Sequence, residues 1–576
     1  MSSRLAKRVV VVLVVAIGAA SVLFLRPGSL AEASPSDGSQ LVAAATARPD
    51  PTALAPIPTP TLEPLPTLLP SASPAAPAPA APAPNPIPRL LADVNAVSTA
   101  GTVFPSDSVT EPTVAVSPFD PNLVALVYQR LTASSYCGLD TGIRISHDGG
   151  RTWLNAPGRP WKGAGRGPNY HGVIAWGPGP VAGSSRLWWA DTTVPRCDYG
   201  AHSVSVSYSD NFGKTWAPLY VERRTPPWIG GYPDITVDCN PASPNFGVVY
   251  VAYNWLADAA AGPGLAVLAS ADKGRSWQIV QVPRVGLSGY HAAWRIDYRV
   301  RTAPDGSAYV AFWEADMHSW NHNDPFASGG LDNVGRVGFA VTHVHYNRTA
   351  RKLAADPAVW SLTLAHNVYT VNQTPASGTV NLLSPDPRWQ MGFDIDQSTG
   401  RLLLAVSDYA ATVAAGHAHG VIRVGRSDDG SNWQWLTISA LPTDVGLQQS
   451  GFKPTLAVRN GVVFVGFHGL TDIEKGASLR ATVGTYYAVS YNGGAAFTAP
   501  TQITKARWYP SVLAANPNGP GLRERADFGP DGIVRYAYSD GRLGSTYPGR
   551  SAVYVALVDP GPVDPRTRIV GPPNAR

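Results

Sequence analysis

The sequence is short of cysteine and of net charge, and it lacks several familiar catalytic motifs. Its 576 residues carry three cysteines and a formal net charge of +5. Four of these positive charges come from Arg4, Lys7, Arg8 and Arg26, which precede every acidic residue, so the rest of the chain is close to neutral. A body this neutral offers no electrostatic footprint for nucleic acid. Because no Gly-x-Ser-x-Gly elbow, phosphate-binding loop or dinucleotide fingerprint occurs, we predict neither a nucleic-acid partner nor a cofactor.

An uncharged apolar run covers residues 9–25, directly after the first three basic residues. Its length lies at the short end for a membrane span and is long for the core of a signal peptide. Basic residues in front of such a run keep the N-terminus cytoplasmic and send the remainder of the chain outward. We therefore predict a signal peptide or signal-anchor helix over residues 1–30. The body is expected to be extracytoplasmic, either secreted or anchored to the membrane by this segment alone.

Residues 31–92 are rich in proline and alanine, with runs such as Pro-Ala-Ala-Pro-Ala-Pro at 74–79. Such a segment cannot bury a core, and its prolines favour an extended conformation. We predict a disordered spacer here. If the N-terminal segment stays in the membrane, this spacer is a stalk that lifts the following domain off the membrane surface.

The body of the chain repeats one short pattern, Ser-x-Asp-x-Gly-x-Thr-Trp. Residues 146–153 match it fully, and residues 270–277 match it with Ser in place of Thr. Weaker copies occur at 210–216, where one extra residue separates Asp from Gly, and at 428–433 and 490–497. In such a hairpin turn the carboxylate accepts hydrogen bonds from backbone N–H groups, and Gly adopts positive φ. The predicted turn residues are Asp148, Asp210, Asp272, Asp428 and Asn492.

This pattern resembles the Asp-box (BNR) repeat of the sialidase-like β-propeller superfamily. Successive copies lie about sixty residues apart, and each follows alternating apolar strands joined by turn residues, as antiparallel blades do. We therefore predict an all-β fold, a β-propeller over residues 93–576 with six or seven four-stranded blades, seven being favoured. The last repeat lacks a fourth strand. Residues 93–103 are predicted to supply it, which closes the ring and covers a free edge.

The starts of first strands and the ends of second strands are expected to meet at one mouth of the propeller channel, opposite the Asp-box turns. Carboxylates, cations and aromatic rings gather at these positions, and such a mixture is typical of a sugar-binding site. The resemblance to sialidases implies an arginine cluster that grips the substrate carboxylate, an acid, and a Tyr nucleophile beside a carboxylate base. Tyr538, within Tyr-Ala-Tyr-Ser-Asp at 536–540, resembles that nucleophile.

The predicted site residues fall into two groups. The predicted catalytic residues are Tyr538, Glu111, Asp234, Glu314 and Asp408. The predicted substrate-binding residues are Arg295, Arg388, Arg525, Trp189, Trp313 and Lys453. The Arg-Ile-Pro motif of the sialidases is absent, and Glu-Pro-Thr at 111–113 stands at the first-strand start instead.

Three functions stay open at this point, all for a protein predicted to be a monomer. The first is a surface-tethered propeller acting on a glycan, as a glycoside hydrolase or a degenerate relative of one. The second is a non-catalytic propeller that binds a glycan or a protein at the same mouth. The third is a structural envelope or assembly factor. Fold alone does not decide among them.

Histidines and aspartates offer one further candidate site. Residues 314–324 hold two histidines and two aspartates that could ligate a metal. Nothing in their surroundings favours a helix that would align them, so a polar loop or lid is predicted and no metal site. The alternating pairs His343/His345 and His417/His419 are expected on the surface.

The three cysteines suit an exported protein with one disulfide. Cys137 and Cys197 lie in equivalent loops of adjacent repeats, shortly before a third strand, and are predicted to be bonded. Cys239 follows a first strand and is expected near the other face of the propeller. It is therefore predicted to be a free, buried thiol.

Overall fold

The computed structural model describes the stretches that carry the strands, and every structural statement below concerns them. They are residues 86–97, 108–131, 139–158, 169–193, 203–222, 231–255, 264–284, 292–317, 334–364, 391–408, 421–438, 450–471, 482–504, 523–542 and 551–561. All described residues belong to one compact unit, Pro82–Arg576. The predicted N-terminal helix and most of the predicted spacer lie outside the described residues. Within the described stretches, no helix has the length and apolar character needed to cross a membrane.

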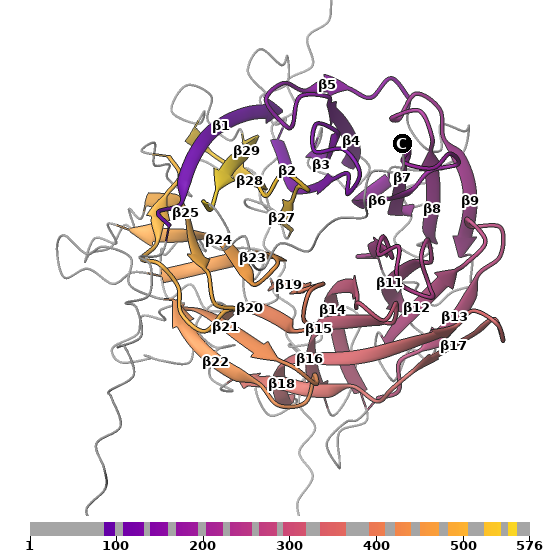
Figure 1. Cartoon of the computed structure of the whole chain (residues 1–576). Coiled ribbons are helices and arrows are strands. Elements are labelled where there is room, and N and C mark those ends of the chain that lie inside the picture. The colour runs from indigo at the N-terminus through magenta and orange to yellow at the C-terminus, as the bar shows by residue number, and fades with distance from the viewer. Residues whose placement is uncertain are drawn as a thin grey trace, which may run out of the picture. The chain divides into compact units, whose positions relative to one another are not determined.

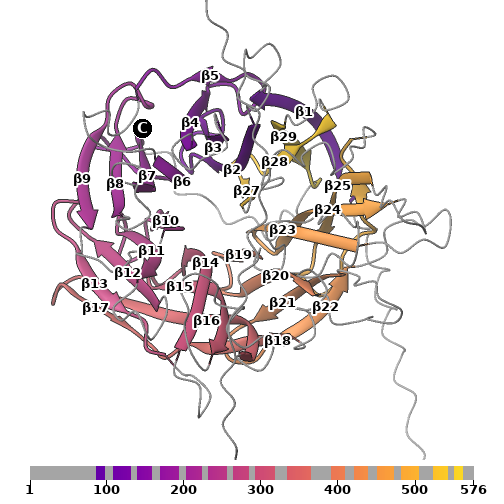
Figure 2. The ribbon, with the colours of Figure 1, turned by 180° about the vertical axis from the view of Figure 1, so that it is seen from behind.

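Seven antiparallel sheets form a ring around a central axis (Figure 1). In six of the sheets the strands run outward from the axis in sequence order. The innermost strands of every pair of neighbouring blades contact each other, so the ring is closed (Figure 2). The prediction of an all-β propeller, with seven blades favoured over six, is confirmed.

The blades are numbered here in sequence order. Blade 1 contains β2 (Ser108–Val116), β3 (Val124–Leu131), β4 (Leu139–Ser146) and β5 (Leu154–Asn155). Blade 2 contains β6 (Asn169–Pro178), β7 (Ser185–Thr193), β8 (Ser203–Ser209) and β9 (Ala217–Glu222). Blade 3 contains β10 (Asp234–Val237), β11 (Val249–Trp255), β12 (Gly264–Ser270) and β13 (Gln278–Gln281). Blade 4 contains β14 (Ala292–Thr302), β15 (Ala308–Met317), β16 (Val334–Asn347), β17 (Lys352–Ala355) and β18 (Val359–Leu364).

The remaining blades complete the ring. Blade 5 contains β19 (Met391–Ile395), β20 (Leu402–Asp408), β21 (Val421–Ser427) and β22 (Gln434–Ile438). Blade 6 contains β23 (Ser450–Arg459), β24 (Val462–Thr471), β25 (Thr482–Ser490) and β26 (Thr501–Gln502). Blade 7 contains β27 (Arg525–Phe528), β28 (Val534–Asp540), β29 (Ala552–Asp559) and β1 (Arg89–Val97).

Blade 7 joins the two ends of the propeller. Its outermost strand is β1, which pairs antiparallel with β29, for example Asn95 with Tyr554. An early strand thus covers the edge that the last repeat would leave open. The strand begins at Arg89, ahead of the predicted boundary at residue 93. It ends at Val97, so the closing strand lies earlier in the chain than the predicted 93–103.

Blade 4 differs from the others at its outer edge. Its third strand, β16, is long enough to pair with two short strands in succession, β17 near its end and β18 along its middle. The turn after β16 begins at Asn347, whose side-chain oxygen accepts a hydrogen bond from Ala350 N at 2.9 Å. This blade therefore carries an extra strand where the sequence repeat is interrupted.

Apolar side chains fill the spaces between blades. One buried cluster lies between each pair of neighbouring blades, with residues from both. Trp189 is 1% exposed in the cluster between blades 1 and 2, and Trp313 is fully buried between blades 4 and 5. Both were predicted to contact substrate. That prediction is corrected, because burying rings of this size contributes to the core rather than to a sugar platform.

In blades 1, 2, 3, 5 and 6 the turn after the third strand has one hydrogen-bond pattern, which we call the Ser–Asx turn. In blade 1 the hydroxyl of Ser146 donates to Asp148 Oδ1 at 2.8 Å and accepts from Gly150 N at 2.8 Å. Asp148 Oδ1 also accepts from Thr152 N at 2.8 Å, and Oδ2 accepts from Thr152 Oγ1 at 2.7 Å. Asp272 and Asn492 accept the equivalent backbone bonds in blades 3 and 6.

Two of the predicted turn residues are one position out. In blade 2 Asn211 accepts from Ser209 Oγ and Thr215 N, while Asp210 pairs with Arg186 at 2.7 Å. The position two residues after the serine is therefore occupied by Asn211, and no extra residue is present.

In blade 5 the corresponding correction applies to the neighbouring aspartate. Asp429 accepts from Ser431 N and Asn432 N, each at 2.8 Å. Asp428 instead pairs with Arg401 at 2.7 Å. The serine at the end of the third strand sets the register of the turn, because its hydroxyl contacts both the Asx side chain and the glycine N–H.

Candidate binding site at the propeller axis

Five residues at the starts of innermost strands share an unusual backbone conformation. In blades 1, 2, 4 and 6, the pairing between the first and second strands shifts near this point, as at a β-bulge. The bulge residues have positive φ: 53° for Glu111, 53° for His171, 57° for Asp297 and 54° for Lys453. Tyr232, two residues before β10, has a φ of 64°. Residues with a Cβ seldom adopt this region, at a cost of order 1–3 kcal/mol each, and such strain clusters at functional sites.

These side chains meet across the blades. His171 Nδ1 lies 2.8 Å from Glu111 Oε2, and the His171 and Tyr232 rings are 4.1 Å apart. The guanidinium carbon of Arg523 lies 5.6 Å from the centre of the Tyr232 ring, and its Nε lies 3.6 Å from Asp297 Oδ1. The axial cluster, as we name it, consists of Glu111, His171, Tyr232, Asp297, Lys453 and Arg523. All are buried except Tyr232, which is half-buried.

Two cations of the axial cluster have buried N–H groups without hydrogen-bond acceptors among the described residues. Within the described part of the chain, Lys453 Nζ has no hydrogen-bond partner, and neither have Nε and Nη2 of Arg523. Arg523 Nη1 donates to the carbonyl of Pro233. Lys453 and Arg523 are only 4% and 2% exposed. A buried cation without full compensation destabilises the fold by several kcal/mol, so these two groups are poised for an anion.

The charge state of Lys453 reflects its surroundings. Burial lowers the pKa of its ammonium group to about 8, against the opposing charges of Glu524, Glu111 and Asp297. Burial also lowers the pKa of the Arg523 guanidinium, and the neighbouring charge of Arg299 acts in the same direction. For both cations, burial outweighs the opposing charges of the nearby carboxylates.

Asp297 is the second carboxyl group of the axial cluster. Burial raises its pKa, against the opposing charges of Arg299 and Arg523. Its Oδ1 accepts a 2.6 Å hydrogen bond from Arg299 Nη1, whereas its Oδ2 has no hydrogen-bond partner in the stretches described. A carboxyl group with a raised pKa and one free oxygen can act as a proton donor to a bound molecule.

Asp234 and Arg525 also lie on innermost strands, as predicted, but they join blades. Asp234 Oδ2 accepts from Val300 N at 2.9 Å and from Arg301 Nη1 at 2.8 Å. Arg525 Nη1 donates to the carbonyl of Ile174 at 3.1 Å and lies 4.0 Å from Asp234 Oδ1. Similar carboxylate bonds from Asp394 and Asp527 reach the inner edges of blades 6 and 1. These residues therefore bond the inner edges of the innermost strands rather than presenting an unpaired group to a ligand.

Arg295 and Glu314, two further predicted site residues, face the interface between blades 3 and 4. Arg295 Nε lies 3.2 Å from Glu314 Oε2, and its Nη1 donates to the carbonyl of Val282 at 3.1 Å. The bulge at Asp297 inserts one residue into β14, which reverses the alternation of faces along that strand. Arg295 consequently packs against Phe312, with the guanidinium carbon 5.2 Å from the ring centre.

Tyr538 is bonded to the closing strand. Its hydroxyl donates to Asp93 Oδ1 at 2.7 Å and accepts from Arg542 Nη2 at 2.7 Å. Burial raises the pKa of this phenol well above its usual value, although the Arg542 charge opposes the shift. Because Asp93 belongs to the outermost strand of blade 7, Tyr538 links strands of its own blade. The predicted placement beside an arginine cluster is therefore corrected.

The remaining predicted residues lie elsewhere in the blades or outside the described stretches. Asp408 accepts a 2.8 Å hydrogen bond from Arg423 Nη1 on the adjacent strand of blade 5. Arg388 lies outside the described residues, as do Cys137 and Cys197 of the predicted disulfide. Cys239 is a free, half-buried thiol that donates to the carbonyl of Trp176 at 3.4 Å, and burial raises its pKa.

Sequence reasoning missed Tyr232, Asp297 and Arg523 as members of the site. Each stands two residues before the first regularly paired residue of an innermost strand, the position that Glu111 and Lys453 also occupy. In three of these blades a proline follows directly. An alignment of these strand starts on their prolines would have brought Tyr232 together with Glu111 and Lys453, whereas Asp297 and Arg523 have no such proline.

No family model matches this chain, and no curated protein matches it either. Among solved structures, it is similar to the GH93 alpha-L-arabinofuranosidase of Fusarium graminearum in complex with arabinobiose. The identity is 13% and the TM-score 0.36, over 62% of this chain and 88% of that one. It is also similar to an alpha-L-arabinanase of Penicillium chrysogenum complexed with arabinobiose, with 14% identity and a TM-score of 0.38, over 69% and 98%.

A third similarity is to the NanB sialidase of Streptococcus pneumoniae. Here the identity is 10% and the TM-score 0.29, over 75% of this chain and 80% of that one. All three are glycoside hydrolases. Likenesses of this size do not transfer an activity, so the function has to be argued from the axial cluster itself.

Proposed function

We propose that the protein acts on an acidic glycan at the axial cluster, with the sugar carboxylate bound between Lys453 and Arg523. The observation that carries this proposal is that Lys453 Nζ and two of the three Arg523 guanidinium nitrogens are buried without a hydrogen-bond acceptor in the described part of the chain. A carboxylate would accept hydrogen bonds from both cations. A guanidinium is well suited to this anion because it can donate to both carboxylate oxygens at once. The half-buried ring of Tyr232 lies beside Arg523 and offers a face for the sugar.

Hydrolysis of that glycan is the narrower form of the proposal. Asp297 is suited to donate a proton, because burial raises its pKa. Glu111, bonded to His171 at 2.8 Å, supplies the second carboxylate of a two-carboxyl mechanism. The sialidase mechanism that the sequence resemblance implies would need Tyr538 beside the ligand. Its hydroxyl is engaged by Asp93 and Arg542, so we assign the reactive roles to Asp297 and Glu111 instead.

The sequence also supports a proposal for where this activity takes place. We propose that residues 1–30 export the chain and that the Pro/Ala-rich segment between them and β1 holds the propeller away from the membrane. If residues 1–30 are cleaved off, the propeller is secreted. Sequencing of the N-terminus of the mature protein, together with fractionation of the producing cells, distinguishes the anchored form from the secreted one. Recovery of the full-length chain in the cytosol would contradict export.

Matched acidic and neutral sugars test the binding proposal. The purified protein is applied to an array that presents sialylated and uronic-acid glycans beside their methyl esters, with arabinobiose as a neutral comparison. We expect binding to the free acids and its loss on esterification, because the ester removes the charge but keeps the shape. Equal binding of acid and ester, or binding of neutral glycans alone, would contradict the proposal.

Turnover decides the catalytic part. Fluorogenic sialosides and uronides are assayed with the wild-type protein and with Asp297→Asn, which keeps the size of the side chain but cannot donate the same proton. Turnover that is lost in Asp297→Asn while glycan binding persists supports hydrolysis. Binding without turnover in the wild-type protein makes this a glycan-binding propeller and overturns the catalytic assignment.

A further inference from the structure

We propose that His343, His345 and Asp356 form a binding site for a divalent transition-metal ion, best suited to Zn²⁺, on blade 4. One ligand atom from each residue can be chosen so that all three lie within 4.8 Å of one another. His345 Nε2 lies 2.9 Å from Asp356 Oδ2, and His343 Nδ1 lies 3.6 Å from the same oxygen. Ligands of a tetrahedral Zn²⁺ stand about 3.3 Å apart, given metal–ligand bonds near 2.0 Å. The three atoms therefore need little movement to share one ion.

The strand geometry explains why these donors are close. His343 and His345 are two residues apart on β16, so both side chains leave the same face of the sheet. Asp356 follows β17, the strand paired with this part of β16. Its backbone N donates to the carbonyl of His343 at 2.9 Å, which fixes the aspartate beside the histidines. The site is thus built on paired backbone rather than on a long loop, as a precise metal site requires.

A second hydrogen-bonded group orients His343. Ser307 Oγ donates to Asp305 Oδ1 at 2.6 Å, so its proton is committed to that carboxylate. The 2.7 Å contact between His343 Nε2 and Ser307 Oγ must then be donated by the histidine. With the proton on Nε2, the lone pair of Nδ1 is directed toward Asp356. Hydrogen bonding of the distal ring nitrogen to a polar group is the usual support for a histidine ligand.

The ring of His343 is also held by stacking. It lies 4.2 Å from the ring of Tyr309 with an angle of 10° between the planes. His345 stands against it edge-on at 3.9 Å. Two adjacent imidazoles that face one carboxylate are arranged as metal ligands are.

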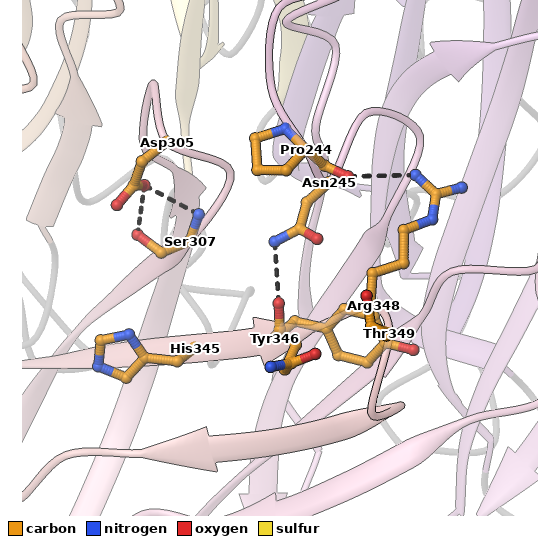
Figure 3. A pocket seen from close by; sticks show the side chains of 9 residues that line it. Pro244, Asn245, Asp305, Ser307, His345, Tyr346, Arg348 and Thr349 are labelled. Atoms are coloured by element: carbon orange, nitrogen blue, oxygen red, sulfur yellow. Dashed lines mark hydrogen bonds between the residues drawn. The ribbon is translucent and has the colours of Figure 1, made fainter.

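A cavity of about 480 Å³ adjoins the site (Figure 3). Its wall includes His345, Ser307, Asp305 and Arg348, so one proposed ligand and both orienting residues belong to it. Three protein ligands leave the fourth position of a tetrahedral ion open for water or a small molecule. The ion would therefore lie at the edge of a space that can admit that fourth ligand. None of these residues belongs to the axial cluster.

Zinc titration tests the site directly. The full chain is dialysed against a chelator and then titrated with ZnCl₂ by calorimetry, and the absorption spectrum is recorded with Co²⁺ in place of Zn²⁺. We expect one ion per chain and a tetrahedral Co²⁺ spectrum. Affinity should fall at least tenfold in His345→Ala and in Asp356→Asn, and roughly tenfold in Ser307→Ala, because the last removes only the support of His343.

The control is His147→Ala, which removes an exposed histidine from the turn of blade 1 and should leave the affinity unchanged. Circular dichroism and thermal unfolding of the metal-free variants establish that each is folded. Zinc affinity that is unchanged in both His345→Ala and Asp356→Asn would overturn the proposal. Failure of the wild-type chain to bind one ion would overturn it as well.

Discussion

The Ser–Asx turns and the axial cluster are both rich in polar groups. In the turns these groups are hydrogen-bonded, whereas in the axial cluster several of them have no partner in the described stretches. Asp148 in the first turn accepts hydrogen bonds from Ser146, Arg151 and Thr152. Burial alone would raise its pKa, but these bonds lower it. In the axial cluster, Lys453 and Arg523 are buried without enough acceptors among the described residues, and burial lowers the pKa of both.

This difference separates the parts that stabilise the propeller from the part that binds. A satisfied turn lowers the free energy of the folded state and leaves nothing for a ligand to complete. Strained residues with unmet hydrogen-bonding groups destabilise the fold, and they persist where a ligand completes them. The repeat that dominates the sequence therefore concerns stability, while the residues of greatest functional interest lie elsewhere on the same blades.

The largest expected effect follows the replacement of Lys453 by Met. This change keeps most of the side-chain volume and removes the buried charge. We expect the affinity for the acidic glycan to fall by roughly 2–4 kcal/mol, or about 30- to 1000-fold in Kd. The free energy of unfolding should stay the same or rise, because an unpaired buried cation is gone. Calorimetry and urea unfolding give the two values.

The matched control is Lys352→Met, which removes an exposed lysine from β17. Its affinity for the glycan should equal that of the wild-type protein. Similar losses in the two variants would mean that binding depends on overall charge rather than on the axial cluster.

Asp148→Ala should produce the converse result. It removes acceptors for several turn hydrogen bonds, so we expect the free energy of unfolding to fall by about 1–3 kcal/mol. The Kd for the glycan should change by less than about twofold, or roughly 0.4 kcal/mol. Urea unfolding beside a glycan titration checks both, and Asp272→Ala should behave alike. A folded variant with much weaker binding would break the separation between turns and site.

The pH dependence of binding should follow Lys453. As the pH rises through about 8, this side chain loses its proton, so the affinity for a carboxylate should fall by up to about tenfold per pH unit. For folding the sign is opposite. The lysine is harder to protonate in the folded state, so its contribution to stability increases between pH 8 and its normal pKa. A flat binding profile in Lys453→Met, measured by calorimetry, attributes the titration to this residue.

The smallest effects should distinguish the two aspartates of the blade 5 turn. Asp429→Ala removes the acceptor for Ser431 N and Asn432 N. Asp428→Ala removes only a pair with Arg401 in which the aspartate side chain is 72% exposed, and exposed pairs contribute little. We expect the larger drop in Tm for Asp429→Ala. The reverse order in differential scanning calorimetry would support the register first predicted from the sequence.

The fold was predictable because its signals are local and repeated. Strand alternation and a period near sixty residues indicated the blades, and the incomplete last repeat indicated a closing strand before blade 1. Errors arose where one residue changes the geometry. Asp210 and Asp428 were predicted as turn residues. Counting two positions on from Ser209 and Ser427 gives Asn211 and Asp429 instead.

The candidate site was less predictable, for reasons that lie in the strands themselves. The bulge in β14 places the side chain of Arg295 on the opposite face of the strand from the one expected. No residue pattern in the sequence predicts this bulge. Trp313 is a large ring at a strand position where a sugar-binding ring was expected, but such rings are equally suited to the spaces between blades. Lys453 and Glu111 were found because they stand at strand starts. Tyr232 and Asp297 stand at the same point but were not compared with them.

A crystal structure of the protein with an acidic glycan chosen from the array tests the central proposal most directly. We predict that the sugar carboxylate accepts hydrogen bonds from Lys453 Nζ and from the Arg523 guanidinium, with the sugar face against Tyr232. The methyl ester of the same sugar should not occupy the site. A carboxylate bound elsewhere, for example beside Tyr538, or a glycan bound without contact to Lys453 and Arg523, would contradict the account.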